Sequence, residues 1–167
     1  MKYLVVLLLV FAAIPSYAQQ LPDFTKIPLS RASEYKAAEP SVLRAAVYVL
    51  SMPFSKDDQS RIHCVKFILK WMTGTPDYSF TFGESKTKYF KNQSDLMGLY
   101  MAAMSKYALE NPASSKDQNA VGVNAMVAVL TYSNNPTNNV NMTQPMKRLW
   151  EANEQGKLGE ALNEEDK

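Results

Sequence analysis

The stretch SSKDQNAVGVNAMVAVLTY, residues 114–132, is the clearest indication of the fold of this 167-residue chain. It opens with serine and aspartate residues, which favour the start of a helix. The thirteen residues from Ala120 to Tyr132 are then apolar at all but three positions. A helix that is apolar on nearly all sides needs neighbours on several sides. We therefore predict that this helix is the most deeply buried element of an all-α fold.

Other parts of the chain also have helical periodicity, with apolar residues recurring at spacings of three and four. Pro53, Gly74 followed by Pro76, and Asn111 followed by Pro112 are typical helix ends. The pattern predicts helices over residues 30–38, 41–52, 55–74, 96–110, 114–132 and 143–158. We expect five to six helices packed as helical hairpins, with at least half of the mature chain helical.

Two parts of the sequence match each other at an offset near sixty residues. Ser55-Lys56-Asp57 matches Ser115-Lys116-Asp117, and with one residue of slip Tyr48, Leu50 and Pro53 match Tyr107, Leu109 and Pro112. One interpretation is a duplicated helical hairpin, in which each copy buries the apolar face of the other. The other is that unrelated helix ends converge on the same capping residues. The outline resembles tetratricopeptide hairpin stacks, but the Trp/Leu/Gly/Tyr spacing of that family is absent, so no binding residues are transferred.

The N-terminus has the pattern of a secretory signal peptide. Lys2 provides the positive charge, residues 3–14 are an unbroken apolar run, and Ser16-Tyr17-Ala18 places small residues at the cleavage site. The run is too short for a membrane span, which needs about 20 residues. We predict cleavage after Ala18. An irregular leader over 19–29, a single helical domain over 30–159 and a charged tail over 160–167 would follow.

The charge and the cysteine content limit the classes of partner and the cellular compartment that we expect for the protein. Without Lys2 the mature chain has 17 Lys and Arg against 16 Asp and Glu, with no basic stripe, which disfavours nucleic acid as a partner. The lone cysteine, Cys64, cannot form an internal disulfide, whereas small extracellular domains of higher organisms usually rely on such bonds. We expect an exported protein, periplasmic or extracellular and bacterial in origin, with no transmembrane segment in the mature chain.

The supply of catalytic groups is small. His63 is the only histidine, and the sequence has no zinc-protease, nucleophile-elbow or phosphate-loop motif, so we expect neither a metal nor a cofactor. His63 and Cys64 are adjacent, and neighbouring residues of a helix point about 100° apart, so we interpret Cys64 as a small buried side chain. Met97, Met101 and Met104 have a spacing that suits Cu(I), but methionines at helical spacing are typical of a core.

The candidate ligand-binding residues are Trp71, Asp77, Tyr78 and Phe80. Residues 77–83 alternate aromatic and small polar side chains, as in a strand, but the segment is too short and isolated to indicate a sheet. Exposed aromatic rings beside an acid suit stacking on sugars or contact with a peptide. The alternative is that the rings fold back over the helix ends. Residues 70–80 resemble segments of uncharacterised secreted helical proteins, a resemblance that implies no activity.

These observations favour an exported, non-enzymatic helical domain that binds a protein, a peptide or an envelope component. Its binding surface would be the concave side of the hairpins or the loop over residues 75–83. The alternative function is a hydrolase or transferase that uses carboxylate and tyrosine groups, such as Asp77 with Tyr78. Two carboxyl groups within catalytic reach in one pocket would favour the enzyme, and a shallow aromatic groove would favour binding.

Overall fold

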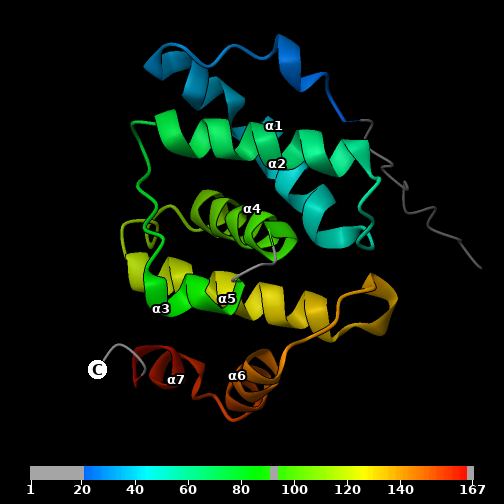
Figure 1. Ribbon diagram of the computed structural model, residues 1–167. Coiled ribbons are helices and arrows are strands. Elements are labelled where there is room, and N and C mark those ends of the chain that lie inside the picture. Colours follow the sequence, from blue (N-terminus) through cyan, green and yellow to red (C-terminus); the bar gives the residue numbers. More distant parts are fainter. Residues whose placement is uncertain (1–20, 91–93, 165–167) are drawn as a thin grey trace, which may run out of the picture.

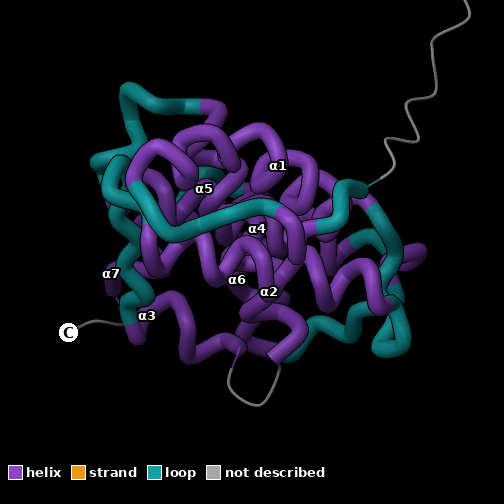
Figure 2. The backbone as a smooth tube through the Cα atoms, turned by 90° about the horizontal axis from the view of Figure 1, so that it is seen from above, coloured by secondary structure: helices purple, strands orange, loops and turns teal. Residues whose placement is uncertain are grey.

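The computed structural model describes residues 21–90 and 94–164, which form helices and loops without a β-strand (Figures 1 and 2). Helices account for 71% of the described part, which confirms the predicted all-α fold with five to six helices. The six longer helices are α1 (Ala32–Ser51), α2 (Gln59–Gly74), α4 (Ser94–Glu110), α5 (Gln118–Asn134), α6 (Gln144–Glu154) and α7 (Leu158–Glu164). The short turns are α3 (Glu84–Thr87), η1 (Phe24–Lys26), η2 (Lys88–Phe90) and η3 (Pro136–Asn138).

Helix α4 lies at the centre of the molecule. It packs against α1 and α2 on one side and against α5 on the other, and α6 and α7 lie on the far side of α5 (Figure 1). Helices α1 and α2 form one hairpin and α4 and α5 form a second. The predicted packing as helical hairpins therefore holds for the four longest helices.

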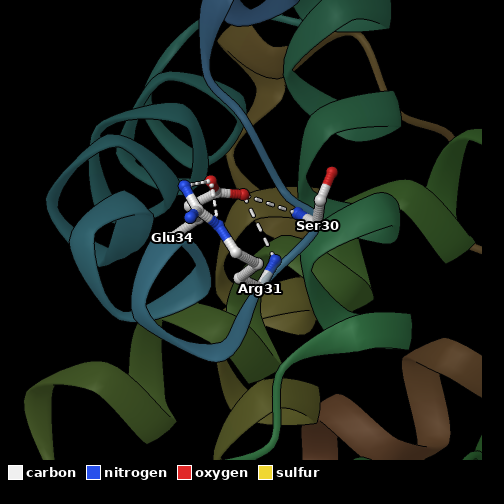
Figure 3. Close-up of polar contacts among 3 residues, drawn as sticks. All are labelled: Ser30, Arg31 and Glu34. Atoms are coloured by element: carbon white, nitrogen blue, oxygen red, sulfur yellow. Dashed lines mark hydrogen bonds and ion pairs between the residues drawn. The ribbon is translucent and has the colours of Figure 1, made fainter.

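The start of α1 is held by a single carboxylate (Figure 3). Glu34 Oε2 accepts hydrogen bonds from the backbone N–H groups of Ser30, at 2.9 Å, and Arg31, at 3.2 Å. Glu34 Oε1 accepts two more from the guanidinium of Arg31, at 2.9 and 2.6 Å. Because the first amides of a helix have no partner within the helix, these bonds stabilise its N-terminus. They also lower the pKa of Glu34, chiefly through Arg31.

The two helices predicted over 30–38 and 41–52 are one helix, so the predicted break at Pro40 is wrong. Proline lacks the N–H that would bond to the carbonyl of Lys36, and such a loss usually ends or kinks a helix. Here Lys36 and Pro40 both lie on the exposed face of α1, where water can reach the freed carbonyl. The buried residues on the opposite face, such as Ala38 and Val42, hold both halves against the core.

The cap of α2 also differs from the prediction. The helix begins at Gln59, and Asp58 rather than Ser55 is its N-cap. Asp58 Oδ1 accepts a hydrogen bond from the backbone N–H of Arg61 at 3.1 Å, and the hydroxyl of Tyr48 donates to Oδ2 at 3.1 Å. This hydrogen bond from Tyr48 therefore links the end of α1 to the start of α2.

The most buried helix is α4, not α5 as predicted. All positions from Gly98 to Ser105 are buried, because α1, α2 and α5 surround this part of the chain. Gly98 permits the close approach of α2, since a Cβ at this position would lie 3.1 Å from both methyl groups of Val65. Helix α5 keeps an exposed side at Asn124 and Thr131. Its Val121, Ala125 and Val129 are fully buried.

The C-terminal region forms two helices where the sequence predicted one over 143–158. Helix α6 ends at Glu154, and Gly156 has a φ of 70°, a left-handed conformation that favours glycine. Helix α7 follows and continues to Glu164, with Leu158 and Leu162 buried. The first residues of the predicted charged tail therefore belong to a packed helix, because Leu162 anchors it.

At the N-terminal side, residues 21–29 are irregular apart from η1, as predicted for the leader. Leu29 is buried, and the ring of Phe24 stacks on Phe67 of α2 at a centroid distance of 4.6 Å. The predicted signal peptide lies outside the described residues, so its cleavage stays a prediction. No helix among the described residues has the length and apolar character needed to cross a membrane.

Candidate functional site

Three of the four predicted ligand-binding residues form one aromatic cluster. Trp71 is fully buried and its indole N–H donates to the carbonyl of Tyr35 at 3.1 Å. The half-buried rings of Tyr78 and Phe80 lie 5.4 and 5.8 Å from the Trp71 ring and 6.4 Å from each other. The loop thus folds back over α2, as the alternative interpretation expected, and only parts of Tyr78 and Phe80 face solvent.

The fourth residue, Asp77, is exposed beside this cluster. A further carboxylate there, Glu39 of α1, was not singled out from the sequence. Glu39 pairs with Lys36 at 3.1 Å, and its side chain is 17% exposed. Burial, and next the charge of Glu39, raises the pKa of Tyr78. The predicted residues line neither the cavity between the starts of α2 and α4 nor the groove between α2 and the leader, so their binding role stays a prediction.

The strongest candidate site is a cavity of about 270 Å³ between the start of α2, the start of α4 and the end of α5. We call it the Arg61 pocket. Its lining combines cations, an acid, aromatic rings, aliphatic side chains and amides: Lys56, Arg61, Asp95, Phe54, Tyr132, Leu96, Leu99, Val140, Asn139 and Asn141. Such a mixture of apolar walls with a few polar groups is typical of ligand-binding pockets.

Arg61 is the chemical centre of this pocket. The residue is only 5% exposed, and its guanidinium lies over two aromatic rings, 5.4 Å from the centroid of Phe54 and 5.5 Å from that of Tyr132. Attraction between a guanidinium and aromatic faces is strongest when both are screened from water. Arg61 Nη1 also donates to the carbonyl of Met52 at 3.3 Å.

The walls of the pocket are held by hydrogen bonds between distant parts of the chain. The hydroxyl of Tyr132 donates to the same Met52 carbonyl at 2.7 Å. The backbone N–H of Phe54 donates to the carbonyl of Asn138 at 3.1 Å, and the Asn138 amide donates to the Tyr132 carbonyl at 2.9 Å. These hydrogen bonds therefore join the 52–54 loop, α5 and η3 beside Arg61.

The electrostatics of the pocket leave the cation without a carboxylate partner. No carboxylate within residues 21–90 and 94–164 forms an ion pair with Arg61. The nearby acid Asp58 is engaged as the cap of α2. Burial raises the pKa of Tyr132, and the charge of Arg61 opposes this shift. Lys56 adds a second cation to the lining, and Asp95 is its one carboxylate.

The arrangement suits an anionic group rather than a metal or a nucleophile. A guanidinium presents a planar fork of N–H donors that matches a carboxylate. The described residues contain no cluster of His, Cys, Asp and Glu able to hold a metal ion. Cys64 is fully buried in the core and His63 is exposed on another face of α2, so the two do not form a catalytic pair.

Sequence reasoning missed Arg61, although the sequence contains a signal for it. Arg61, Cys64, Ile68 and Trp71 follow at spacings of three, four and three, so all four lie on one stripe of α2. All four are buried. A cation in an otherwise apolar stripe is unusual and indicates either a buried pair or a ligand site.

Comparison with models of protein families, with curated proteins and with solved structures finds no match to this chain. The class of the protein is therefore defined by its own fold and site: an all-α domain of stacked hairpins with a cationic pocket at the ends of α2, α4 and α5.

Proposed function

We propose that this chain is an exported, non-enzymatic domain, periplasmic or extracellular, that binds a peptide or protein segment. An acidic side chain of the partner would enter the Arg61 pocket. The observation that carries this proposal is the buried guanidinium of Arg61, which contacts the rings of Phe54 and Tyr132 and has no carboxylate partner in the described chain. The export is supported by the signal-peptide pattern of residues 1–18.

The free energy of burial explains why such a cation favours an anionic ligand. A charge removed from water is costly unless it is paired and hydrogen-bonded. The rings and the Met52 carbonyl stabilise Arg61 only in part, because a guanidinium has five N–H donors. A bound carboxylate supplies the missing charge and accepts two of these donors side by side.

The dimensions and rim favour a peptide over a larger compact ligand. The volume of 270 Å³ is below the range of about 300–1,000 Å³ typical of pockets for whole small molecules. It suits one side chain of a longer partner. Asn139 and Asn141 offer amide groups to a peptide backbone, and Lys56 extends the positive field that guides an acidic segment.

The test compares N-acetyl-glutamate N-methylamide with N-acetyl-glutamine N-methylamide, titrated into the mature chain and followed by NMR chemical shifts. We expect saturable shifts around Arg61 and Tyr132 with the glutamate compound alone. Arg61→Lys keeps the charge but loses the fork, and a charge-assisted hydrogen bond contributes about 1.5–3 kcal/mol, so binding should weaken roughly tenfold or more.

The matched control is Arg148→Lys on α6, an exposed residue outside the pocket, which should leave the titration unchanged. Equal shifts with both compounds, or full binding by Arg61→Lys, would contradict the proposal. The alternative of a hydrolase or transferase gains a second carboxylate, Glu39, near Asp77 and Tyr78. Neither the Arg61 pocket nor the groove between α2 and the leader joins these three groups, so binding is the better supported function.

A further inference from the structure

We propose that the outer side of α2 holds a second site, for a single fatty acid whose carboxylate contacts lysines. The site is a groove of about 320 Å³ between α2 and the leader around η1. We call it the α2 groove. Its apolar part contains Pro22, Phe24 and Phe67, and its basic part contains His63, Lys66 and Lys70. None of these residues lines the Arg61 pocket.

The apolar part of the groove is built from two aromatic rings. Phe67 is 5% exposed and anchored in the core, and the ring of Phe24 stacks on it with an interplanar angle of 25°. Phe24 is half-buried, so part of its ring faces the groove. Because Phe24 lies outside the helical hairpins, its ring forms a wall that an acyl chain can contact without entering the core.

The basic part of the groove lies on α2, a helix whose formally charged residues are all positive. Helix α2, Gln59–Gly74, contains no Asp or Glu. His63, Lys66 and Lys70 follow at spacings of three and four and are all exposed. Neither Lys66 nor Lys70 has an ion-pair partner within the described residues. The chain as a whole is close to neutral, so this concentration of cations is local.

The one acid in the groove does not neutralise these lysines. Asp23 pairs with Lys26 at 3.2 Å and accepts a hydrogen bond from the Thr25 hydroxyl at 2.6 Å. The Asp23 carboxylate is therefore already paired with residues of η1. The α2 groove, with its apolar wall and unpaired lysines, is complementary to a molecule that has an apolar tail and an anionic head. The contacts to the tail and to the head both add to the affinity of such a molecule.

Isothermal titration of the mature chain with decanoate, 1-decanol and decyltrimethylammonium tests this inference, with the two ions kept below their critical micelle concentrations and 1-decanol below its solubility limit. All three have the same tail, so their ranking measures the contribution of the head. We expect decanoate to bind most tightly and decyltrimethylammonium most weakly. In Lys66→Gln/Lys70→Gln, the loss of two exposed charge contacts should weaken decanoate binding roughly tenfold.

Two further variants separate the head from the tail and from general charge. Phe24→Ala should weaken the binding of all three compounds by a similar factor, with the far-ultraviolet circular dichroism of the wild type retained. Lys147→Gln/Arg148→Gln removes two exposed cations from α6 and should leave decanoate binding unchanged.

Three outcomes would overturn the inference. Equal affinity for the three compounds would mean that the lysines do not contact the head. Binding to phosphatidylglycerol vesicles without binding to decanoate would mean that the surface meets a membrane instead of a single molecule. Loss of decanoate binding in Arg61→Lys but not in Lys66→Gln/Lys70→Gln would place the carboxylate in the Arg61 pocket, which separates this inference from the proposed function.

Discussion

Cys64 lies in the core of the helical bundle, with its side chain fully screened from water. Burial raises the pKa of the thiol to about 12, because the thiolate would lose its hydration. The nucleophilic form of cysteine is the thiolate, so a thiol in this position is inert. The interpretation of Cys64 as a small buried side chain is confirmed by its burial.

Thiol chemistry provides a residue-scale prediction. At pH 8, Ellman's reagent should fail to label the folded chain and should label it fully in denaturant. The unfolded thiol ionises near its ordinary pKa of 9.0, whereas the folded thiol keeps its proton until about pH 12. The free energy of unfolding should therefore fall as the pH rises through this window.

The control for this prediction is Cys64→Ala, measured by urea unfolding between pH 8 and 11. Burial also raises the pKa of Tyr48, Tyr78, Tyr100 and Tyr132, so the variant should keep part of the alkaline slope. The variant should lose the part of this slope that the single thiol contributes. An identical slope in the two proteins, or rapid labelling of the native chain, would mean that Cys64 is reached by water.

At the scale of the elements, the two hairpins correspond with an offset of 59 residues. The caps Asp58 and Asp117 are separated by this number, as are the first residues of α2 and α5 and the last residues of α1 and α4. Buried positions also coincide: Val42, Ala45, Ala46 and Val49 in α1 match Met101, Met104, Ser105 and Ala108 in α4. The serine-lysine-aspartate match at sixty was therefore one residue out of register. The correspondence supports the hypothesis of a duplicated hairpin.

Another contact between elements joins the start of α1 to the end of α2. The hydroxyl of Tyr35 donates to the carbonyl of Leu29 at 3.2 Å, which holds the ring against Gly74. A Cβ at Gly74 would overlap the Tyr35 hydroxyl oxygen and the ring carbon that carries it. The close approach of the Tyr35 ring therefore favours glycine at position 74, the last residue of α2.

Gly74→Ala should force the Tyr35 ring outward and lower the free energy of unfolding by about 1–3 kcal/mol, as overpacking does. The measurement is urea unfolding. In a Tyr35→Ala background the same change should cost much less, because the clash is gone. Gly159→Ala in α7, where no atom lies within 4 Å of the new Cβ, should be neutral or slightly stabilising. Equal costs in the two backgrounds would show that the ring is not the obstacle.

At the scale of the whole molecule, α4 and α5 connect the first hairpin to the two C-terminal helices. Helix α4 contacts the first hairpin, and α5 carries α6 and α7 on its other side (Figure 1). Val129 of α5 is fully buried, and its neighbour Ala128 is half-buried. A polar group at Val129 would have no water and no partner, whereas Gln155, at the end of α6, is exposed.

Val129→Asp should therefore unfold the domain or leave it barely stable. Burial of an unpaired charge is among the few changes that cost on the order of 4 kcal/mol or more, which is comparable to the stability of a typical domain. Gln155→Asp should have a melting temperature close to that of the wild type. The measurement is a pair of thermal unfolding curves on the mature chain. Similar midpoints for Val129→Asp and the wild type would mean that this side of α5 is exposed.

Local features of the sequence were sufficient to predict the fold class and most of the helices. Apolar spacing, capping residues and breakers act over a few residues, so Gly74, Asn111 and Thr143 bound their helices as predicted. The features that could not be predicted depend on contacts between distant residues. The core holds α1 together across Pro40, places α4 rather than α5 at the centre, and brings Phe54 and Tyr132 into contact with Arg61. Local periodicity carries no information about these tertiary contacts, because each contact arises from the packing of segments that are far apart in the chain.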